Sequence, residues 1–236
     1  MTNFFQVKKK SKLSNARLGL INTSHGKINT PSFIFCGTKA TVKSVLPSQL
    51  KLARTQIILS NTYHLMLQPG PEVISKEGGL QSFTDWNGPM MTDSGGYQIF
   101  SLGYGSVSEE IKGKNNNAKR KSLIKITEDG ASFRNYINGD KVFLSPERSI
   151  ELQRDFGADL IFVLDECTPF NVSKKYTEKS MYMSHRWAER CINSFDSKFK
   201  KYNSTFGSSG KQSLYGIIQG GVSVSYTHLR AHETPL

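Results

Sequence analysis

Four short apolar runs along this chain each end on a polar side chain, and this pattern is its most informative feature. The polar residues that follow the runs are Asn61, Asp93, Asp165 and Gln219. Uninterrupted apolar runs are typical of strands that are covered on both faces, as in a parallel sheet. Because α/β folds keep their chemistry at the carboxyl ends of such strands, the pattern predicts an α/β protein with a site built from these side chains.

The segment Pro89–Gln98 contains the clearest of these strand ends. Its apolar residues run directly into the sequence Asp93-Ser94-Gly95-Gly96-Tyr97. Glycine lets the main chain approach a ligand closely because it has no Cβ. A carboxylate and a flat ring at the end of a sheet suit a planar, hydrogen-bonding ligand such as a nucleobase. On this segment alone, an aspartate that only satisfies the amides of a turn is an equally open interpretation.

The remaining pattern predicts a β-rich entry, several helices and an inserted antiparallel unit. Residues 1–35 contain two strand-like segments around a turn at Ser24–Lys27. An insertion at about residues 103–144 has Asp-Gly and Asn-Gly turns, which predict a three-stranded antiparallel meander. Helices are expected to begin at Pro47, Pro71, Pro146 and about Ser173. The last of these carries an apolar stripe expected to pack in the core: Tyr176, Met183, Trp187, Cys191 and Phe195.

Charge and cysteine usage narrow the possible partners. The 31 basic residues exceed the 19 acidic ones, and the net charge of +12 favours a polyanion such as tRNA, other RNA, DNA or an anionic membrane. The basic loop Lys119–Lys121 is the expected RNA contact, although a charge excess can also serve solubility alone. No apolar stretch is long enough for a transmembrane helix. Three widely spaced cysteines without C-x-C or C-x-x-C spacing predict a reducing cytoplasm and no metal site.

The last residues have a different character from the rest of the chain. Residues 224–236 follow no apolar period and resemble the translated read-through of a sequencing adapter. We expect this tail to be non-native, so that the domain itself covers residues 1–223. His228 and His232 are spaced by one helical turn, but within such a tail they are not expected to bind a metal.

From about Phe33 to Gly221 the chain resembles the tRNA-guanine transglycosylase (queuine tRNA-ribosyltransferase) family, in its bacterial form. The resemblance rests on seven blocks in the family's order: Gly37–Lys43, Asn61–Gly70, Thr92–Gln98, Leu144–Glu147, Gly157–Asp159, Asp165–Pro169 and Gln219–Gly221. It implies a TIM (β/α)8 barrel, incomplete here, with an antiparallel segment at its start. It also implies base exchange, in which guanine at the anticodon wobble position of a tRNA is replaced by a 7-deazaguanine precursor of queuosine.

The resemblance also assigns roles to the strand-end residues. Asp93 matches the family's general acid/base, which also binds the purine edge, and Ser94–Gly96 complete that substrate-binding segment. Tyr97 matches the aromatic residue that stacks on the base. Asp165 matches the carboxylate that accepts hydrogen bonds from the purine N–H and amino groups, and Gln219 matches the group that recognises the ring carbonyl.

Two blocks of the family are missing from these 236 residues. The attacking aspartate lies in a block resembling Phe-Asp-x-Val-x-Pro-Thr-Arg, and the structural zinc is held by a C-x-C-x-x-C…His set; neither occurs here. We therefore expect a base pocket without the nucleophile or the zinc, in an inactive fragment of a cytoplasmic enzyme that is a homodimer at full length. Two other interpretations stay open: a non-catalytic tRNA-binding subunit of the same fold, or a barrel nucleosidase acting on free purine nucleosides.

Overall fold

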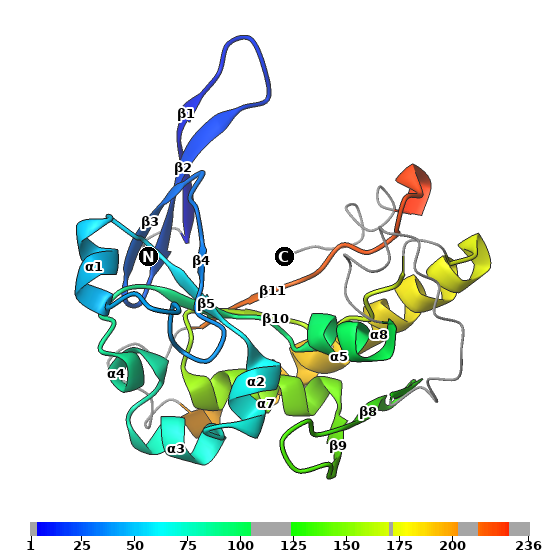
Figure 1. The fold of residues 1–236 in the computed structure, drawn as a ribbon. Coiled ribbons are helices and arrows are strands. Elements are labelled where there is room, and N and C mark those ends of the chain that lie inside the picture. Colours follow the sequence, from blue (N-terminus) through cyan, green and yellow to red (C-terminus); the bar gives the residue numbers. More distant parts are fainter. Residues whose placement is uncertain (1–3, 105–123, 170–171, 203–211, 227–236) are drawn as a thin grey trace. The chain divides into compact units, whose positions relative to one another are not determined.

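The computed structural model describes residues 4–104, 124–169, 172–202 and 212–226 (Figure 1). The chain divides into two compact units, each made of several segments. The first unit comprises Met1–Asp93, Leu152–Ile161 and Lys198–Ser213. The second unit comprises Ser94–Glu151, Phe162–Ser197 and Leu214–Leu236.

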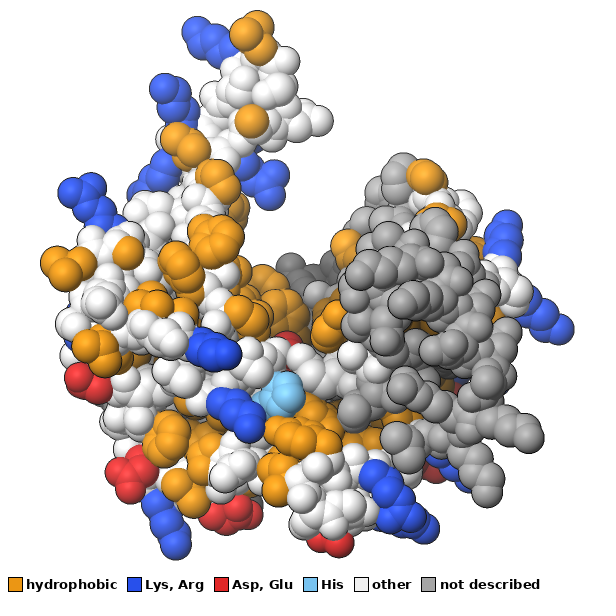
Figure 2. Space-filling view, viewed as in Figure 1, with side chains coloured by type: hydrophobic (Ala, Val, Ile, Leu, Met, Phe, Trp, Pro, Cys, Tyr) orange, Lys and Arg blue, Asp and Glu red, His pale blue; other side chains and the backbone are white. Residues whose placement is uncertain are grey.

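The first unit begins with a three-stranded antiparallel sheet, in agreement with the β-rich entry predicted for residues 1–35. Its strands are β1 (Phe5–Lys10), β2 (Arg17–Thr23) and β3 (Gly26–Thr30), in the order β1-β2-β3. The turn between β2 and β3 lies at Ser24–His25, inside the predicted turn. The sequence did not predict β1. This strand forms one edge of the sheet, and basic side chains project along its hairpin in Figure 2.

The second sheet has five strands and positions the predicted strand-end residues. Its order is β11-β10-β6-β5-β4, and the pairs β4–β5, β5–β6 and β6–β10 are parallel. The strands are β4 (Phe35–Cys36), β5 (Ile58–Ser60), β6 (Met90–Thr92), β10 (Leu160–Phe162) and β11 (Ser213–Tyr215). The α/β class is therefore confirmed. Across the described residues this sheet is open, with β11 and β4 at its edges, and its identification as an incomplete (β/α)8 barrel remains a prediction.

Short helices connect the strands of the first unit. They are α1 (Pro47–Leu52), α2 (Thr62–Leu67), α3 (Pro71–Lys76) and α4 (Leu80–Thr84). Proline opens α1 and α3, as predicted, because its fixed φ suits a first helical turn and its missing N–H has no partner there. The helices α2 and α4 were not predicted, and each is only six or five residues long. Helix α7 (Pro146–Phe156) opens with the third predicted proline and leads to β10.

The second unit contains the predicted meander and the long helix. The antiparallel strands β7 (Lys125–Thr127), β8 (Gly130–Arg134) and β9 (Lys141–Leu144) confirm the meander. Among the described residues, this unit also contains α5 (Gly96–Tyr104) and most of α8 (Lys174–Tyr202). The predicted loop Lys119–Lys121 lies outside the described residues. In the part of the chain that is described, no helix combines the length and the apolar character needed to cross a membrane.

Helix α8 is the structural support of the second unit. Met183, Trp187 and Cys191 of the predicted stripe are buried, which confirms core packing for these three. The indole Nε1 of Trp187 donates to the Glu128 carbonyl at 2.7 Å. Because that carbonyl belongs to the turn between β7 and β8, the bond fixes the meander to the middle of the helix.

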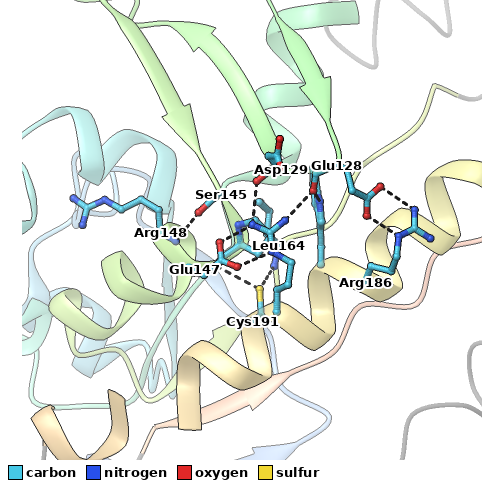
Figure 3. A network of polar contacts seen from close by, with 11 residues as sticks. Glu128, Asp129, Ser145, Glu147, Arg148, Leu164, Arg186 and Cys191 are labelled. Carbon is cyan, nitrogen blue, oxygen red and sulfur yellow. Dashed lines mark hydrogen bonds and ion pairs between the residues drawn. The ribbon is translucent and has the colours of Figure 1, made fainter. Parts of the chain in front are cut away.

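Two arginines of α8 reinforce this attachment through ion pairs (Figure 3). Arg186 pairs with Glu128 at 2.6 and 2.9 Å, and Arg190 pairs with Glu147 at 2.6 and 2.8 Å. The hydrogen bond from Arg186 lowers the pKa of the Glu128 carboxyl. For Glu147, burial favours the neutral form, but hydrogen bonds led by Arg190 outweigh it and lower the pKa. Both carboxylates are therefore charged at neutral pH and stabilise the contact between α8, the meander and the start of α7.

Candidate functional site

Asp165 follows β10, and the main chain on each side of it is held by α8. The Leu164 amide donates to the Cys191 sulfur at 3.3 Å (Figure 3). The Glu166 amide donates to the Ser184 hydroxyl at 3.1 Å. Burial raises the pKa of the Cys191 thiol to about 12, so the sulfur stays neutral. The direction in which the Asp165 side chain leaves the main chain is thus fixed from both sides.

Asp165 is only 5% exposed, and three neighbouring side chains donate to its carboxylate. One oxygen accepts from the Ser94 hydroxyl at 3.2 Å, and the other accepts from the Gln219 side-chain amide and more weakly from the Cys167 thiol at 3.7 Å. Three residues that the sequence assigned to one site, Ser94, Asp165 and Gln219, are therefore joined in one hydrogen-bonded group.

The glycines of the predicted segment make this group possible. A Cβ built at Gly96 would lie 2.6 Å from the Asp165 carbonyl oxygen and 3.0 Å from a carboxylate oxygen, so a larger residue would displace Asp165. Gly95 has φ +89°, a conformation that side-chain-bearing residues rarely adopt. The Gly-Gly pair therefore brings the start of α5 against the end of β10, as its position after a predicted strand suggested.

A cavity of about 600 Å³ lies beside this group within the second unit. Its volume falls within the range of small-molecule sites, about 300–1,000 Å³. Tyr97 lines this cavity and is 48% exposed. The lining residues are Tyr97, Phe100, Cys167, Thr168, Pro169, Val172, Lys174, Thr177, Gln219, Gly220, Gly221, Val222 and Ser223. The predicted stacking residue and the predicted carbonyl-binding residue thus share one cavity.

Asp93 belongs to the first unit, where residues that follow β5 hold it. The Asn61 side-chain amide donates to one carboxylate oxygen at 2.5 Å, and the Thr62 amide donates to the other at 2.8 Å. The Thr62 hydroxyl also donates to the Asp93 carbonyl at 2.6 Å. Asn61 was among the predicted strand-end residues. Thr62 was not singled out, although its place directly after a strand-end residue was a usable signal.

His64 adds a titratable ring near Asp93 in the first unit. Burial is the largest influence on its pKa and lowers it, and the charge of Lys39 lowers it further. The negative charge of Asp93 acts in the opposite direction but is the smallest of the three influences. The imidazole is therefore neutral at pH 7, so it adds no positive charge to the surroundings of Asp93.

Glu166 and Tyr176 form a buried pair that the sequence did not reveal. Glu166 is 5% exposed, and the Tyr176 hydroxyl donates to its carboxylate at 2.5 Å. Tyr176 was predicted only as part of the apolar stripe, because nothing in the spacing of α8 indicates a partner for its hydroxyl. The pair links the segment after β10 to the first turns of α8.

No described residues fit the zinc that the resemblance implies. No group of three or more His, Cys, Asp or Glu side chains in the described ranges is arranged to hold a metal ion. Cys36 is exposed, Cys167 is half-buried and Cys191 is buried. No chemical step is therefore assigned to a metal.

Comparisons with known proteins identify the family of this chain. The family model described as TGT, queuine tRNA-ribosyltransferase, matches residues 11–234. A queuine tRNA-ribosyltransferase of Roseiflexus sp. (strain RS-1) is 42% identical over 224 residues, which cover 94% of this chain and 56% of the relative. Those of Staphylococcus haemolyticus (strain JCSC1435) and Staphylococcus aureus (strain JH9) are 44% and 43% identical over 213 residues, 90% of this chain and 48% of each relative. The chain spans about half the length of the curated relatives it matches.

Proposed function

Because the chain belongs to the queuine tRNA-ribosyltransferase family, we propose that it supplies the base-recognition part of a tRNA-guanine transglycosylase. The proposed reaction takes place in the cytoplasm and replaces guanine at the anticodon wobble position of a tRNA with a 7-deazaguanine precursor of queuosine. The observation that carries the proposal is the hydrogen-bonded pair of Asp165 and Gln219 beside a cavity with an exposed aromatic ring.

The pair of Asp165 and Gln219 complements one edge of guanine. That edge presents a ring N–H and an amino group as donors, next to a carbonyl oxygen as acceptor. A carboxylate can accept from both donors, and a carboxamide N–H can donate to the carbonyl. The side-chain bond from Gln219 to Asp165 is exchanged for bonds to the base when guanine binds, so few polar groups lose a partner.

Tyr97 supplies the flat surface for this base. Its ring lines the cavity and is half exposed, so a purine can stack on it while its edge faces Asp165 and Gln219. Stacking of a nucleobase on an aromatic side chain contributes about 1–3 kcal/mol. The base has to leave its stack in the RNA before it can enter such a pocket.

Asp93 is proposed as the general acid/base of the exchange. When the glycosidic bond breaks, its electron pair passes to the ring nitrogen of the leaving guanine, and a proton must follow. A carboxyl group can deliver that proton and recover one from the incoming base. Asn61 and Thr62 fix the carboxylate in place, and Asp93 directly precedes Ser94 of the Asp165 group.

The nucleophile that attacks the ribose is not among these 236 residues, since no Phe-Asp-x-Val-x-Pro-Thr-Arg block occurs. We therefore propose that these residues alone bind the base without completing the exchange. The family's zinc and the homodimer are proposed for the full-length protein only.

Calorimetric titration with guanine tests the pocket. The 236-residue chain should bind guanine, and Asp165→Asn should weaken binding about 10- to 100-fold, because a hydrogen bond to a charged group contributes about 1.5–3 kcal/mol. Asp196→Asn is the matched control, since it removes one carboxylate from an exposed position on α8. Equal affinities for guanine in the wild type and Asp165→Asn would show that the base binds elsewhere.

Incubation with labelled guanine and tRNA separates the remaining functions. The wild-type 236-residue chain is expected to incorporate no label, and incorporation would contradict the missing nucleophile. Release of free guanine from guanosine without tRNA would instead identify a nucleosidase.

A further inference from the structure

Positive charge is distributed very unevenly along the chain. Residues 1–71 contain ten lysines and arginines and no aspartate or glutamate, so they carry +10 of the net charge of +12. Residues 72–236 contain the other 21 of the 31 basic residues together with all 19 acidic ones, and they are close to neutral. The charge excess that points to a polyanion therefore belongs to the beginning of the chain.

All ten of these basic residues are exposed in the first unit: Lys8, Lys9, Lys10, Lys12, Arg17, Lys27, Lys39, Lys43, Lys51 and Arg54. Five of them, Lys8 to Arg17, lie on the β1–β2 hairpin. Among the described residues, none of these five forms an ion pair with a carboxylate. Figure 2 accordingly shows blue side chains along the hairpin and no red ones.

Lys10 and Arg17 face each other across the hairpin, since they are paired residues of β1 and β2. Like charges opposite one another on neighbouring strands destabilise a sheet when nothing neutralises them. The Arg17 guanidinium lies 6.0 Å from the centroid of the Phe5 ring, which holds the group in place but leaves its charge unchanged. The hairpin thus maintains two adjacent cations that an anion would stabilise.

The surface around this pair is hollow and polar. A hollow of about 600 Å³ is lined by Phe5, Val7, Lys10, Ser11, Ser14, Asn15, Ala16 and Arg17, all from the hairpin. Lysine, arginine, serine and asparagine are the side chains that proteins use to bind the phosphates and sugars of nucleic acids. The hollow therefore offers two cations and several hydroxyl or amide donors to one anionic ligand.

Protection of a sheet edge is the alternative explanation for lysines on β1. Edge strands often carry lysine because it discourages pairing with another chain. This explanation covers Lys8, Lys9 and Lys10, but it does not cover Arg17, which lies on the central strand β2. It also gives no reason for a complete absence of carboxylates over 71 residues.

We propose that the β1–β2 hairpin, with Lys10 and Arg17 at its centre, binds the phosphate backbone of RNA. The proposal rests on the proposed function, in which tRNA is the substrate, and it assigns to the hairpin a contact with the tRNA backbone in addition to the recognition of the exchanged base. The loop Lys119–Lys121, which the sequence predicts as an RNA contact, lies outside the described residues and stays a prediction.

The double substitution Lys10→Gln with Arg17→Gln tests the hairpin in the 236-residue chain. Binding of unmodified tRNA is measured by fluorescence anisotropy over a range of salt concentrations. At about 0.1 M salt the affinity should fall about tenfold or more, and the slope of log affinity against log salt should fall by about 1.5 to 2, because two phosphate contacts are lost.

The meander offers a matched control. Arg134 and Lys141 are also exposed and also face each other across two antiparallel strands, but Asp140 adjoins this pair. The double substitution Arg134→Gln with Lys141→Gln removes the same charge and should leave tRNA affinity within about twofold of the wild type, because no phosphate contact is lost. An equal loss of tRNA affinity in both variants would show that only the net charge of the chain affects binding, and it would overturn the proposal.

Two further readouts identify the partner and separate this proposal from the proposed function. If the hairpin variant loses binding to vesicles of phosphatidylcholine with phosphatidylserine while its tRNA affinity is unchanged, the surface binds membrane and the proposal is wrong. Guanine binding is measured on the same protein and should not change. Binding of tRNA through the hairpin without binding of guanine would contradict the proposed base pocket but not the proposed RNA-binding surface.

Discussion

Strand β10 has a buried aspartate on each side, and the two are held in different ways. Asp159 directly precedes the strand in the first unit. It accepts from the main-chain amides of His25 and Met90 at 3.1 and 3.0 Å. It also accepts from the His25 ring at 2.9 Å and from the Gln81 side chain at 3.1 Å. Asp165, after the strand in the second unit, accepts from the side chains of Ser94, Cys167 and Gln219.

The difference lies in what the donors can do when a ligand arrives. A main-chain amide in a folded segment cannot turn away, so Asp159 is committed to joining the β2–β3 turn, α4 and β6. Side-chain donors such as Gln219 can rotate and pair with a ligand instead. Burial does not distinguish the two carboxylates, since Asp159 is 2% exposed and Asp165 is 5% exposed. The type of donor distinguishes the two carboxylates. This difference agrees with the rule that residues at the amino ends of barrel strands serve stability and residues at the carboxyl ends serve chemistry.

Removal of the Asp159 carboxylate gives the largest effect that this comparison predicts. Asp159→Ala leaves the amides of His25 and Met90 and the Gln81 side chain without their acceptor in a buried place. Each buried donor that is left without an acceptor costs about 1–3 kcal/mol. Because several donors lose their acceptor together, the free energy of unfolding, measured by urea denaturation, should fall by about 3–5 kcal/mol.

Asp165→Ala is the matched substitution at the other end of the strand. Its former donor Gln219 lines the neighbouring cavity and can turn toward the water there, so the free energy of unfolding should fall by less than about 2 kcal/mol. Equal decreases in the free energy of unfolding for the two variants would mean that Asp165 stabilises the fold as much as Asp159 does, and the distinction by donor type would be wrong.

The sequence predicted Asp165 and Gln219 as site residues because each follows an apolar run, which is a local signal. It did not indicate that Asp159 anchors the fold, although Asp159 ends one of the seven family blocks. The partners of Asp159 are distant in sequence: His25 is 134 residues away and Gln81 is 78 residues away. Neither partner has a local pattern that indicates where its side chain will point, so only the folded structure reveals the contact.

The contrast between local signals and contacts distant in sequence also explains which elements of the fold were predicted. The meander was predicted because Asp-Gly and Asn-Gly turns are local signals, and the prolines located the starts of α1, α3 and α7 for the same reason. Strand β1 was missed because the run Phe5–Lys10 ends in three lysines, and its pairing with β2 includes an irregularity between Val7 and Lys9. Short helices such as α2 have too few residues for a helical period to emerge.

Alkaline pH tests how firmly the carboxyl end of β10 is anchored by the Cys191 thiol. The folded pKa of Cys191 is about 12, above the ordinary value of 9.0. Its contribution to stability is therefore complete below pH 9 and is lost as the pH rises toward about 12, because the thiol ionises first in the unfolded chain. Between pH 8 and about 10.5 this contribution to the free energy of unfolding decreases by about 2 kcal/mol.

Urea denaturation of wild type and Cys191→Ala at both pH values isolates this contribution. The variant is less stable than the wild type at either pH because it loses buried volume. Its free energy of unfolding should, however, decrease between pH 8 and about 10.5 by about 2 kcal/mol less than that of the wild type. Burial also raises the pKa of Tyr215, and this effect cancels because both proteins share it. Equal decreases in the free energy of unfolding of the two proteins would show that the thiol ionises freely in the folded state and that the segment before Asp165 is open to water.

The smallest predicted effect concerns Tyr97, and it tests whether the carboxyl end of β10 serves a flat ligand. Tyr97→Ala should weaken guanine binding about tenfold, near the lower end of the range of about 1–3 kcal/mol for base stacking, because the ring is half exposed and not enclosed on both faces. Tyr97→Phe keeps the ring and should bind guanine within about twofold of the wild type, since a hydroxyl that makes no bond to the base contributes little. A loss in Tyr97→Phe as large as in Tyr97→Ala would assign the affinity to the hydroxyl, and the pocket would then recognise its ligand by hydrogen bonds alone.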